Sequence, residues 1–225
     1  FVNLRKGDVV LQNAGNSGVG LLLSQIASID LGLNVVSLVR RGSRSETDFQ
    51  AMVDYLMETG RNSQVVDEGE PLQNRDASKR FRDSLRGSSE PKLALNAVGG
   101  DSAALLSKCL STSASRDSAV MVTYGGMSKK PVTVGTPQFI FQDVTLKGYW
   151  HSRWMVDASY TEKQAMVNKL VDLVLDHGLE CPPANVWELS DLGNILKAQR
   201  APATGPIRRK QVVRCHENGN EITFR

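Results

Sequence analysis

The chain has 225 residues, of which 40% are hydrophobic and 23% are charged, and its formal net charge is +3. This composition is typical of a folded chain with a sizeable core and argues against wholesale disorder. The small net charge gives no reason to expect nucleic acid as a partner. No run approaches the roughly 18 apolar residues that span a bilayer, so we expect no membrane span.

The cysteines and histidines predict neither a disulfide framework nor a metal site. Cys109, Cys181 and Cys215 are widely separated and form no CxxC pair, and their number is odd. The three histidines have no metal-ligand spacing with each other or with cysteine. The sequence begins at Phe1, and its first residues lead directly into a predicted strand. We therefore expect the natural start of the protein to lie upstream of this chain.

Strand and helix patterns alternate over the first 150 residues. Short apolar runs predict strands at 8–14, 33–40, 62–69, 91–100, 118–127 and 143–150. Helical spacing predicts helices at 18–32, 48–60, 75–87 and 101–112, the first ending at Gly32. Strands separated by helices favour a parallel sheet with right-handed crossovers. The fold class is thus α/β, a doubly wound, mostly parallel Rossmann sheet of six strands.

Beyond the predicted sheet the pattern is less regular. The charged stretch between Glu68 and Glu90 is interpreted mainly as a solvated helix face. A helix is expected at 159–178, with Ser159 and Glu162 as a capping box. Its apolar face is expected to pack in the core, and it carries Met166, Leu170, Leu173 and Val174.

A further helix is expected at 189–205 and a last strand at 208–215. The expected domains are a dinucleotide-binding domain at 1–155, an amphipathic linking helix at 156–184 and a C-terminal segment at 185–225.

Several unusual residues fall at or just past the carboxyl ends of the predicted strands. They are Asn16, Arg40, Gly99, Tyr124 and Trp150. In a parallel α/β sheet this edge holds the nucleotide crevice. The shared placement predicts a nucleotide site more strongly than any one motif does.

The stretch "AGNSGVG" at 14–20 is a variant of the dinucleotide fingerprint G-x-G-x-x-G. Gly15 is expected to allow the tight turn and Gly20 the close packing of helix on strand, while Ser17 replaces the middle glycine. The amides of residues 17 to 20 are expected to face a diphosphate from a helix N-terminus. The alternative is a glycine-rich turn without a ligand, and the flanking strand and helix favour the site.

The end of the second predicted strand indicates which dinucleotide binds. An NAD site has an acidic residue there for the ribose 2′-hydroxyl, but Arg40 stands at that position and no carboxylate lies between Val36 and Ser45. A guanidinium suits a 2′-phosphate. Arg41 and Arg44 are expected to add to the positive electrostatic field around this phosphate. The sequence therefore predicts NADPH, against the alternative of a solvated arginine cluster.

Familiar catalytic motifs are missing. There is no Tyr-x-x-x-Lys pair, and "GNSGVG" does not fit G-x-S-x-G, so Ser17 is a poor nucleophile candidate. His151 is a candidate general acid, although a lone histidine is more often a surface or packing residue.

Five segments carry a resemblance to a known family: "GDVVLQNAGNSGVG", "LVR", "PKLALNAVGG", "VMVTYGGMSKKPV" and "FQDVTLKGYWHSRW". In this order the chain resembles the mitochondrial trans-2-enoyl-CoA reductases, also called enoyl-acyl-carrier-protein reductases, of the zinc-free medium-chain dehydrogenase/reductase superfamily. The likeness is strongest at 7–40 and 91–154 and weakest at 41–90. It implies NADPH-dependent reduction of trans-2-enoyl thioesters, on coenzyme A or acyl carrier protein, in mitochondrial fatty acid biosynthesis.

The resemblance also implies which residues bind the coenzyme. Arg41 and Gly42 replace an acid and an arginine of the family, and His151 replaces an apolar residue. The implied residues are Asn16, Ser17, Gly18 and Val19 at the diphosphate, Arg40 and Arg41 at the 2′-phosphate, Tyr124, Gly125, Gly126 and Met127 along the nicotinamide half, Tyr149, Trp150, His151 and Ser152 as a second lining, and Lys210 reaching in from the other domain.

The resemblance further implies that the family's catalytic tyrosine lies in a β-rich, GroES-like domain before this chain, which leaves no catalytic residue within it. The segment 185–225 is expected to return to that domain, so that the isolated chain exposes an apolar patch. A homodimer through the sheet edge near Asp143–Trp150 is expected by likeness. Two alternatives remain open: an NADPH quinone or alkenal reductase of the same superfamily, and an inactive NADPH-binding fragment.

Overall fold

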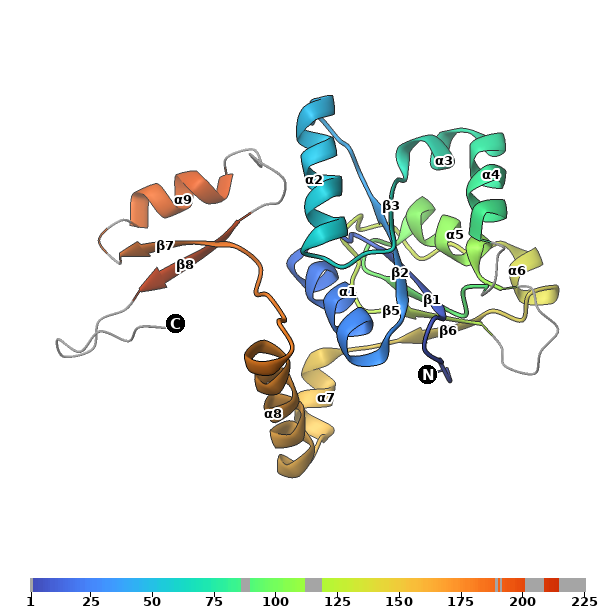
Figure 1. Cartoon of the computed structure of the whole chain (residues 1–225). Coiled ribbons are helices and arrows are strands. Elements are labelled where there is room, and N and C mark those ends of the chain that lie inside the picture. The colour runs from blue at the N-terminus through green and yellow to red at the C-terminus, as the bar shows by residue number, and fades with distance from the viewer. Residues whose placement is uncertain are drawn as a thin grey trace.

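A computed structural model of the chain describes residues 2–85, 90–111, 119–188, 190, 192–200 and 209–214. Within these residues the strands form a six-stranded sheet and a two-stranded sheet, and every pairing between them is parallel (Figure 1). The larger sheet has the order β3-β2-β1-β4-β5-β6. Its strands are β1 (Val9–Asn13), β2 (Asn34–Val39), β3 (Gln64–Asp67), β4 (Leu93–Asn96), β5 (Val120–Thr123) and β6 (Thr145–Gly148). The predicted Rossmann sheet is confirmed, with each strand shorter than its sequence pattern.

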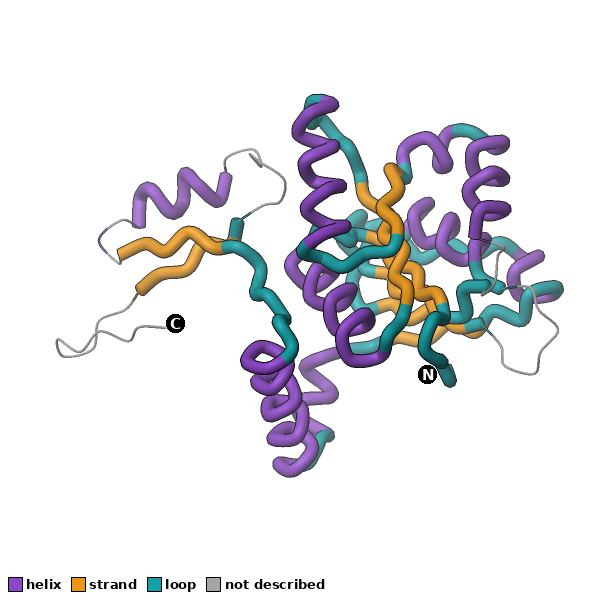
Figure 2. The backbone as a smooth tube through the Cα atoms, viewed as in Figure 1, coloured by secondary structure: helices purple, strands orange, loops and turns teal. Residues whose placement is uncertain are grey.

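Helices cover both faces of this sheet (Figure 2). On one face lie α1 (Gly18–Leu31) and α2 (Glu46–Glu58), and the other carries α3 (Gly69–Gln73), α4 (Arg75–Leu85) and α5 (Gly100–Cys109). The largest cluster of buried apolar side chains joins the strands to α4 and α5, and includes Leu11, Leu38, Phe81, Leu106 and Met121. Burial on both faces explains why the strand sequences are almost continuously apolar.

The predicted solvation of the charged stretch is only partly right. Helix α4 has charged residues on its outer side, but Ala77, Phe81 and Leu85 are buried against the sheet. Glu68, which opens this stretch, is 2% exposed. Charged residues dominate the sequence pattern, whereas the three apolar side chains at helical spacing decide which face of the helix packs.

The ends of two helices agree with the sequence. Helix α1 stops at Gly32, which takes the left-handed conformation at φ 61° and donates its amide to the carbonyls of Ala27 and Ser28. Helix α8 (Tyr160–Asp176) begins with the expected capping box, in which Ser159 and Glu162 bond each other reciprocally.

The remaining elements lie at the edge of the sheet or beyond it (Figure 1). They are α6 (Thr136–Ile140), α7 (His151–Asp157), β7 (Ala184–Glu188), α9 (Leu192–Arg200) and β8 (Lys210–Arg214). The sequence pattern predicted no helix at α3, α6 or α7 and no strand at β7, because the three helices are short and β7 has no clear alternation. The expected core packing of α8 is also wrong in part: Leu173 is buried, but Leu170 and Val174 are exposed.

None of the helices in the described residues has both the length and the apolar character that crossing a membrane requires.

Candidate nucleotide-binding site

A pocket of about 290 Å³ opens at the carboxyl edge of the sheet, where β1 and β4 lie side by side. The connections from these two strands lead to opposite faces of the sheet, which makes this the topological switch point of the fold. Residues that follow five different strands line the pocket. Among them are Asn16, Arg40, Arg44, Glu68, Val98 and Met127.

Two glycines let the loop after β1 pack tightly. A Cβ on Gly15 would lie 2.5 Å from Cβ of Ser37, and one on Gly20 would lie 2.5 Å from the carbonyl oxygen of Ala14. Both positions therefore need glycine for close approach. The expected role of Gly15 is corrected in one respect, because the positive φ of this turn, 53°, falls on Ala14.

Helix α1 begins directly after this loop, but not all of the amides at its N-terminus are available to an anion. The amide of Ser17 donates to the Ala14 carbonyl at 2.9 Å, and the amide of Gly20 donates to Ser17 Oγ at 3.0 Å. Gly18 and Val19 come first in the helix, so their amides have no partner within it. The expectation that all four amides of residues 17 to 20 bind a diphosphate is thus reduced to the middle two.

A cationic side chain from the far end of the chain lies over the same turn. A Cβ on Gly18 would be 2.9 Å from Cε and 3.3 Å from Nζ of Lys210, the first residue of β8. Lys210 is therefore brought to the loop, as the resemblance implied. Asn16 lies on the pocket side of this loop and donates from Nδ2 to Met52 Sδ at 3.4 Å.

Arg40 follows β2 directly, and its guanidinium is already paired. Its Nε donates to Oε1 of Glu68 at 2.5 Å, and the other oxygen of Glu68 accepts from Ser102 Oγ at 2.5 Å. Glu68 follows β3, the strand beside β2. Sequence reasoning excluded a carboxylate only within residues 36–45, and missed the one that the neighbouring strand brings in.

A buried network of polar side chains fixes Glu68 from behind. Ser102 Oγ accepts from Asn13 Nδ2 at 3.0 Å, and the same nitrogen of Asn13 donates to Asn96 Oδ1 at 2.8 Å. Asn96 in turn donates to Thr123 Oγ1 at 3.1 Å. Three strands and α5 are thereby joined beneath the pocket, and buried polar groups with satisfied partners of this kind rigidify a fold.

The other two arginines of the loop point to different partners. The guanidinium of Arg41 pairs with Glu46 and lies 5.3 Å above the ring of Phe49. Arg44 lines the pocket and donates from Nη1 to the carbonyls of Arg40 and Arg41, both at 3.3 Å. Its Nε is buried and has no hydrogen-bond partner among the described residues.

The loop after β5 carries the next group of predicted residues. Tyr124 follows the strand directly, and its hydroxyl is buried without a hydrogen-bond partner in the described part of the chain. Burial raises the pKa of this phenol above its ordinary value of 10.0, which keeps it a neutral donor. Gly126 has open space around it, and Met127 lines the same pocket as Arg40.

The last predicted group surrounds the end of β6. Tyr149 Oη lies 3.4 Å from His151 Nδ1, and the rings of His151 and Trp154 are stacked with centroids 6.3 Å apart. Trp150 is 67% exposed, and Ser152 lies in the first turn of α7. His151 is exposed, and these contacts join it to the aromatic side chains of Tyr149 and Trp154.

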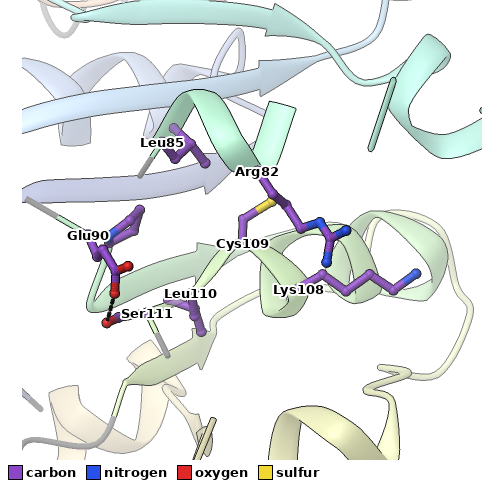
Figure 3. Close-up of a pocket in the computed structure, with 8 residues that line it drawn as sticks. Arg82, Leu85, Glu90, Lys108, Cys109, Leu110 and Ser111 are labelled. Atoms are coloured by element: carbon purple, nitrogen blue, oxygen red, sulfur yellow. Dashed lines mark hydrogen bonds between the residues drawn. The ribbon is translucent and has the colours of Figure 1, made fainter. Parts of the chain in front are cut away.

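A second, smaller cavity lies away from the crevice, between the end of α4 and the end of α5 (Figure 3). Its volume of about 10 Å³ has room for about one water molecule. Cys109 lies at its wall, and burial raises the pKa of the thiol to about 12. The carboxylate of Glu90 accepts a hydrogen bond from Ser111 Oγ at 2.6 Å (Figure 3). A thiol held this firmly protonated is not a nucleophile at neutral pH.

No family model matches the chain. Curated relatives do match it, and the following three are each named enoyl-[acyl-carrier-protein] reductase, mitochondrial. The Dictyostelium discoideum protein is 38% identical over 174 residues, which are 77% of this chain and 45% of the relative. The Xenopus tropicalis protein is 33% identical over 216 residues, 95% and 56% of the two chains. The human protein is 35% identical over 202 residues, 90% and 50%.

Solved structures give a similar result. The complex of Etr1p with NADP and crotonyl-CoA has a TM-score of 0.73 and 27% identity, covering 88% of this chain and 51% of that one. The mitochondrial 2-enoyl thioester reductase Etr1p/Etr2p heterodimer from Candida tropicalis also has a TM-score of 0.73, with 26% identity and the same coverage. A mycobacterial quinone oxidoreductase, at 20% identity and a TM-score of 0.68 over 88% of this chain and 55% of that one, shares the fold alone.

The strand order, the glycine-rich turn and the pocket at the switch point define a Rossmann-type dinucleotide-binding domain. The chain spans about half the length of the curated relatives it matches. Over that half, the chain is similar in sequence and fold to the mitochondrial enoyl-[acyl-carrier-protein] reductases.

Proposed function

We propose that the chain is the NADPH-binding part of an enzyme that reduces trans-2-enoyl thioesters to acyl thioesters in mitochondria. One observation carries the proposal: Asn16 of the loop that leads into α1, Arg40 and Arg44 line one pocket at the switch point of the sheet. The names of the relatives support the mitochondrial location. The Etr1p complex with NADP and crotonyl-CoA supports the coenzyme and the substrate class.

The residues of the crevice fit a phosphorylated dinucleotide. The free amides of Gly18 and Val19 suit a diphosphate at the start of a helix, where the partial positive charge lies. Lys210 adds a full charge at the same turn. Two buried donors have no hydrogen-bond partner among the described residues: Arg44 Nε, in a side chain that lines the pocket, and Tyr124 Oη, in the loop that follows β5. Each is a position where a ligand acceptor would remove the cost of an unsatisfied buried group.

The division of chemical labour follows from these positions. Bound NADPH supplies the hydride that reduces the double bond. The amides of Gly18 and Val19 hold the diphosphate, and Arg40 and Arg44 hold the 2′-phosphate. Tyr124 with Gly125, Gly126 and Met127 orients the nicotinamide half. We assign proton transfer to no residue of this chain. The relatives have about as much sequence again, and we place the acid there.

Two finer points belong to the same proposal. The acyl group is carried by coenzyme A or acyl carrier protein, because both present the same thioester. A homodimer forms through the open edge of β6, where Leu146, Tyr149 and Trp150 are exposed. An unpaired edge strand with exposed apolar side chains favours pairing with a second copy.

The coenzyme assignment is tested by titrating Arg40→Ala with NADPH and NADH. Loss of the charge-assisted bonds predicts NADPH binding weaker by about tenfold to a hundredfold, with a much smaller change for NADH. Because the substitution leaves Glu68 buried and unpaired, the double variant Arg40→Ala with Glu68→Gln serves as the control for folding. Equal losses for both coenzymes would contradict the assignment. Turnover of quinones but not of crotonyl thioesters by the full-length protein would contradict the substrate class.

A further inference from the structure

Arg40, Arg41 and Arg44, the three arginines after β2, do not contribute equal positive charge to the pocket at the switch point. A pair of opposite charges attracts an approaching anion far less than a lone cation does, because its net charge is zero. The contacts of each guanidinium therefore decide which of the three can select a phosphate.

Arg40 is neutralised by Glu68. The 2.5 Å contact from Nε to Oε1 joins a side chain that is 59% exposed to a carboxylate that is 2% exposed. Ser102 and the network behind it hold that carboxylate in place. Glu68 also lines the pocket itself. An anion entering the pocket thus meets a fixed negative charge together with the positive charge of Arg40.

Arg41 is neutralised as well, and it does not line the pocket. Its guanidinium pairs with Glu46 in the first turn of α2 and covers the ring of Phe49. Its partners hold it toward α2.

Arg44 differs from both. Its side chain lines the pocket, and the polar contacts it makes within the described residues are to the carbonyls of Arg40 and Arg41. These carbonyls hold the guanidinium without cancelling its charge. Its Nε is buried, and no acceptor bonds it within the part of the chain that the structure describes. The turn between these residues contains Gly42 at φ 61°, which folds the chain back so that Arg44 reaches the pocket.

We propose that Arg44 supplies the net positive charge that selects the 2′-phosphate of the coenzyme, and that Glu68 reduces the share of Arg40. This inference rests on the proposed function, since it names the selecting residue of that site. Arg40 still offers its terminal nitrogens as donors. The excess charge that distinguishes a phosphate from a hydroxyl comes from Arg44.

The test compares dissociation constants for NADPH and NADH, measured by coenzyme fluorescence on the chain and its variants. Arg44→Ala is expected to weaken NADPH at least tenfold and to change NADH less than twofold. Arg44→Gln removes the charge but retains an amide donor for the two carbonyls, so it gives the same result even if the alanine variant misfolds. Arg44→Lys keeps the positive charge, so it is expected to retain part of the preference for NADPH over NADH.

Three further variants sharpen the result. Glu68→Gln keeps an acceptor for Arg40 and removes the negative charge, so NADPH binding tightens severalfold while NADH binding is unchanged. Arg41→Ala removes a paired charge from the same loop and weakens NADPH less than threefold. Arg80→Ala, whose ion pair with Glu70 lies on the α3–α4 surface, controls for the change in net charge.

The outcomes separate this inference from the proposed function. If Arg40→Ala abolishes the preference for NADPH while the Arg44 variants behave like Arg41→Ala, the inference fails and the function stands. If NADPH binding by Glu68→Gln is weaker than in the original chain, the neutralising role of Glu68 is wrong. If neither Arg40 nor Arg44 affects the preference, the coenzyme assignment itself fails.

Discussion

The six-stranded domain and the part of the chain from α7 onward are built in different ways. In the domain, strands and helices bury a continuous apolar core on both faces of the sheet. From residue 150 onward, three of the described side chains are buried: Leu173, Leu179 and Ile195. Most of the stability of the described chain must therefore reside in the domain.

The contacts that join the two parts converge on α1. Gln25 bonds both backbone groups of Glu180, Asp30 pairs with Lys169 at 2.5 Å, and Gly18 lies under Lys210. Helix α1, which directly follows the loop that lines the pocket, is thus also the helix against which the C-terminal part is positioned. One part of the chain supplies stability, and the other is held in place by a few polar contacts to α1.

The largest effect is expected from the same substitution made in each part. Leu11→Ala in the core of β1 should lower the free energy of unfolding by about 2–5 kcal/mol, because it removes a fully buried side chain and leaves a cavity. Leu175→Ala on α8, where the side chain is 74% exposed, should change it by less than about 0.5 kcal/mol. Denaturant unfolding of both variants measures the difference. Equal losses would mean that the two parts share one core.

A smaller effect is expected at the junction. Gln25→Ala removes the side chain that accepts from the Glu180 amide at 2.8 Å and donates to its carbonyl at 3.0 Å. The loss should be about 1–3 kcal/mol. Hydrogen exchange should quicken at residues 177–183 and leave β1 protected.

Gln50→Ala is the matched control for this junction, because Gln50 is exposed and donates to the side chain of Asp54 on the same helix. Faster exchange in β1, or no change at 177–183, would contradict the role of Gln25.

The smallest effect is expected at the start of α8. Ser159→Ala should cost about 1 kcal/mol, because it removes the N-cap. The bonds from the Ser159 hydroxyl and amide lower the pKa of Glu162 below its ordinary value of 4.5. A lowered pKa stabilises the helix fully above the unfolded-state value, and this stabilisation is lost as the pH falls through the lowered value.

Melting curves at pH 7 and in the acid range check the sign of this effect. The original chain should lose more stability on acidification than Ser159→Ala does. The variant Glu162→Gln should lose the same pH dependence while keeping the serine cap. An acid response that is unchanged in both variants would contradict the cap.

Much of the domain could be predicted from the sequence, because its signals are local. Apolar runs such as Val9–Leu11 and the turn at 14–20 need only neighbouring residues to be recognised, and the fold confirms all six strands. The capping box of α8 is local in the same way. Short elements such as α3 and β7 offered too few residues for a periodic pattern.

The polar contacts beneath the pocket could not be predicted in this way. Glu68 and Arg40 are 28 residues apart, and Asn13 and Asn96 are 83 apart. Their meeting depends on the order in which the strands align. The one available signal was position, since Asn96 ends β4 and Glu68 directly follows β3, at the edge where the nucleotide site was expected. The charge of this stretch predicted that Glu68 would lie on the surface, but its side chain is buried.

Selection of a 2′-phosphorylated dinucleotide by this pocket can be measured by titrating the chain with NADPH and NADH side by side at low and high salt. NADPH is expected to bind at least tenfold more tightly at low salt, and added salt should narrow the gap, because the selecting contact is ionic. Equal affinities, or tighter binding of NADH at low salt, would contradict this selection.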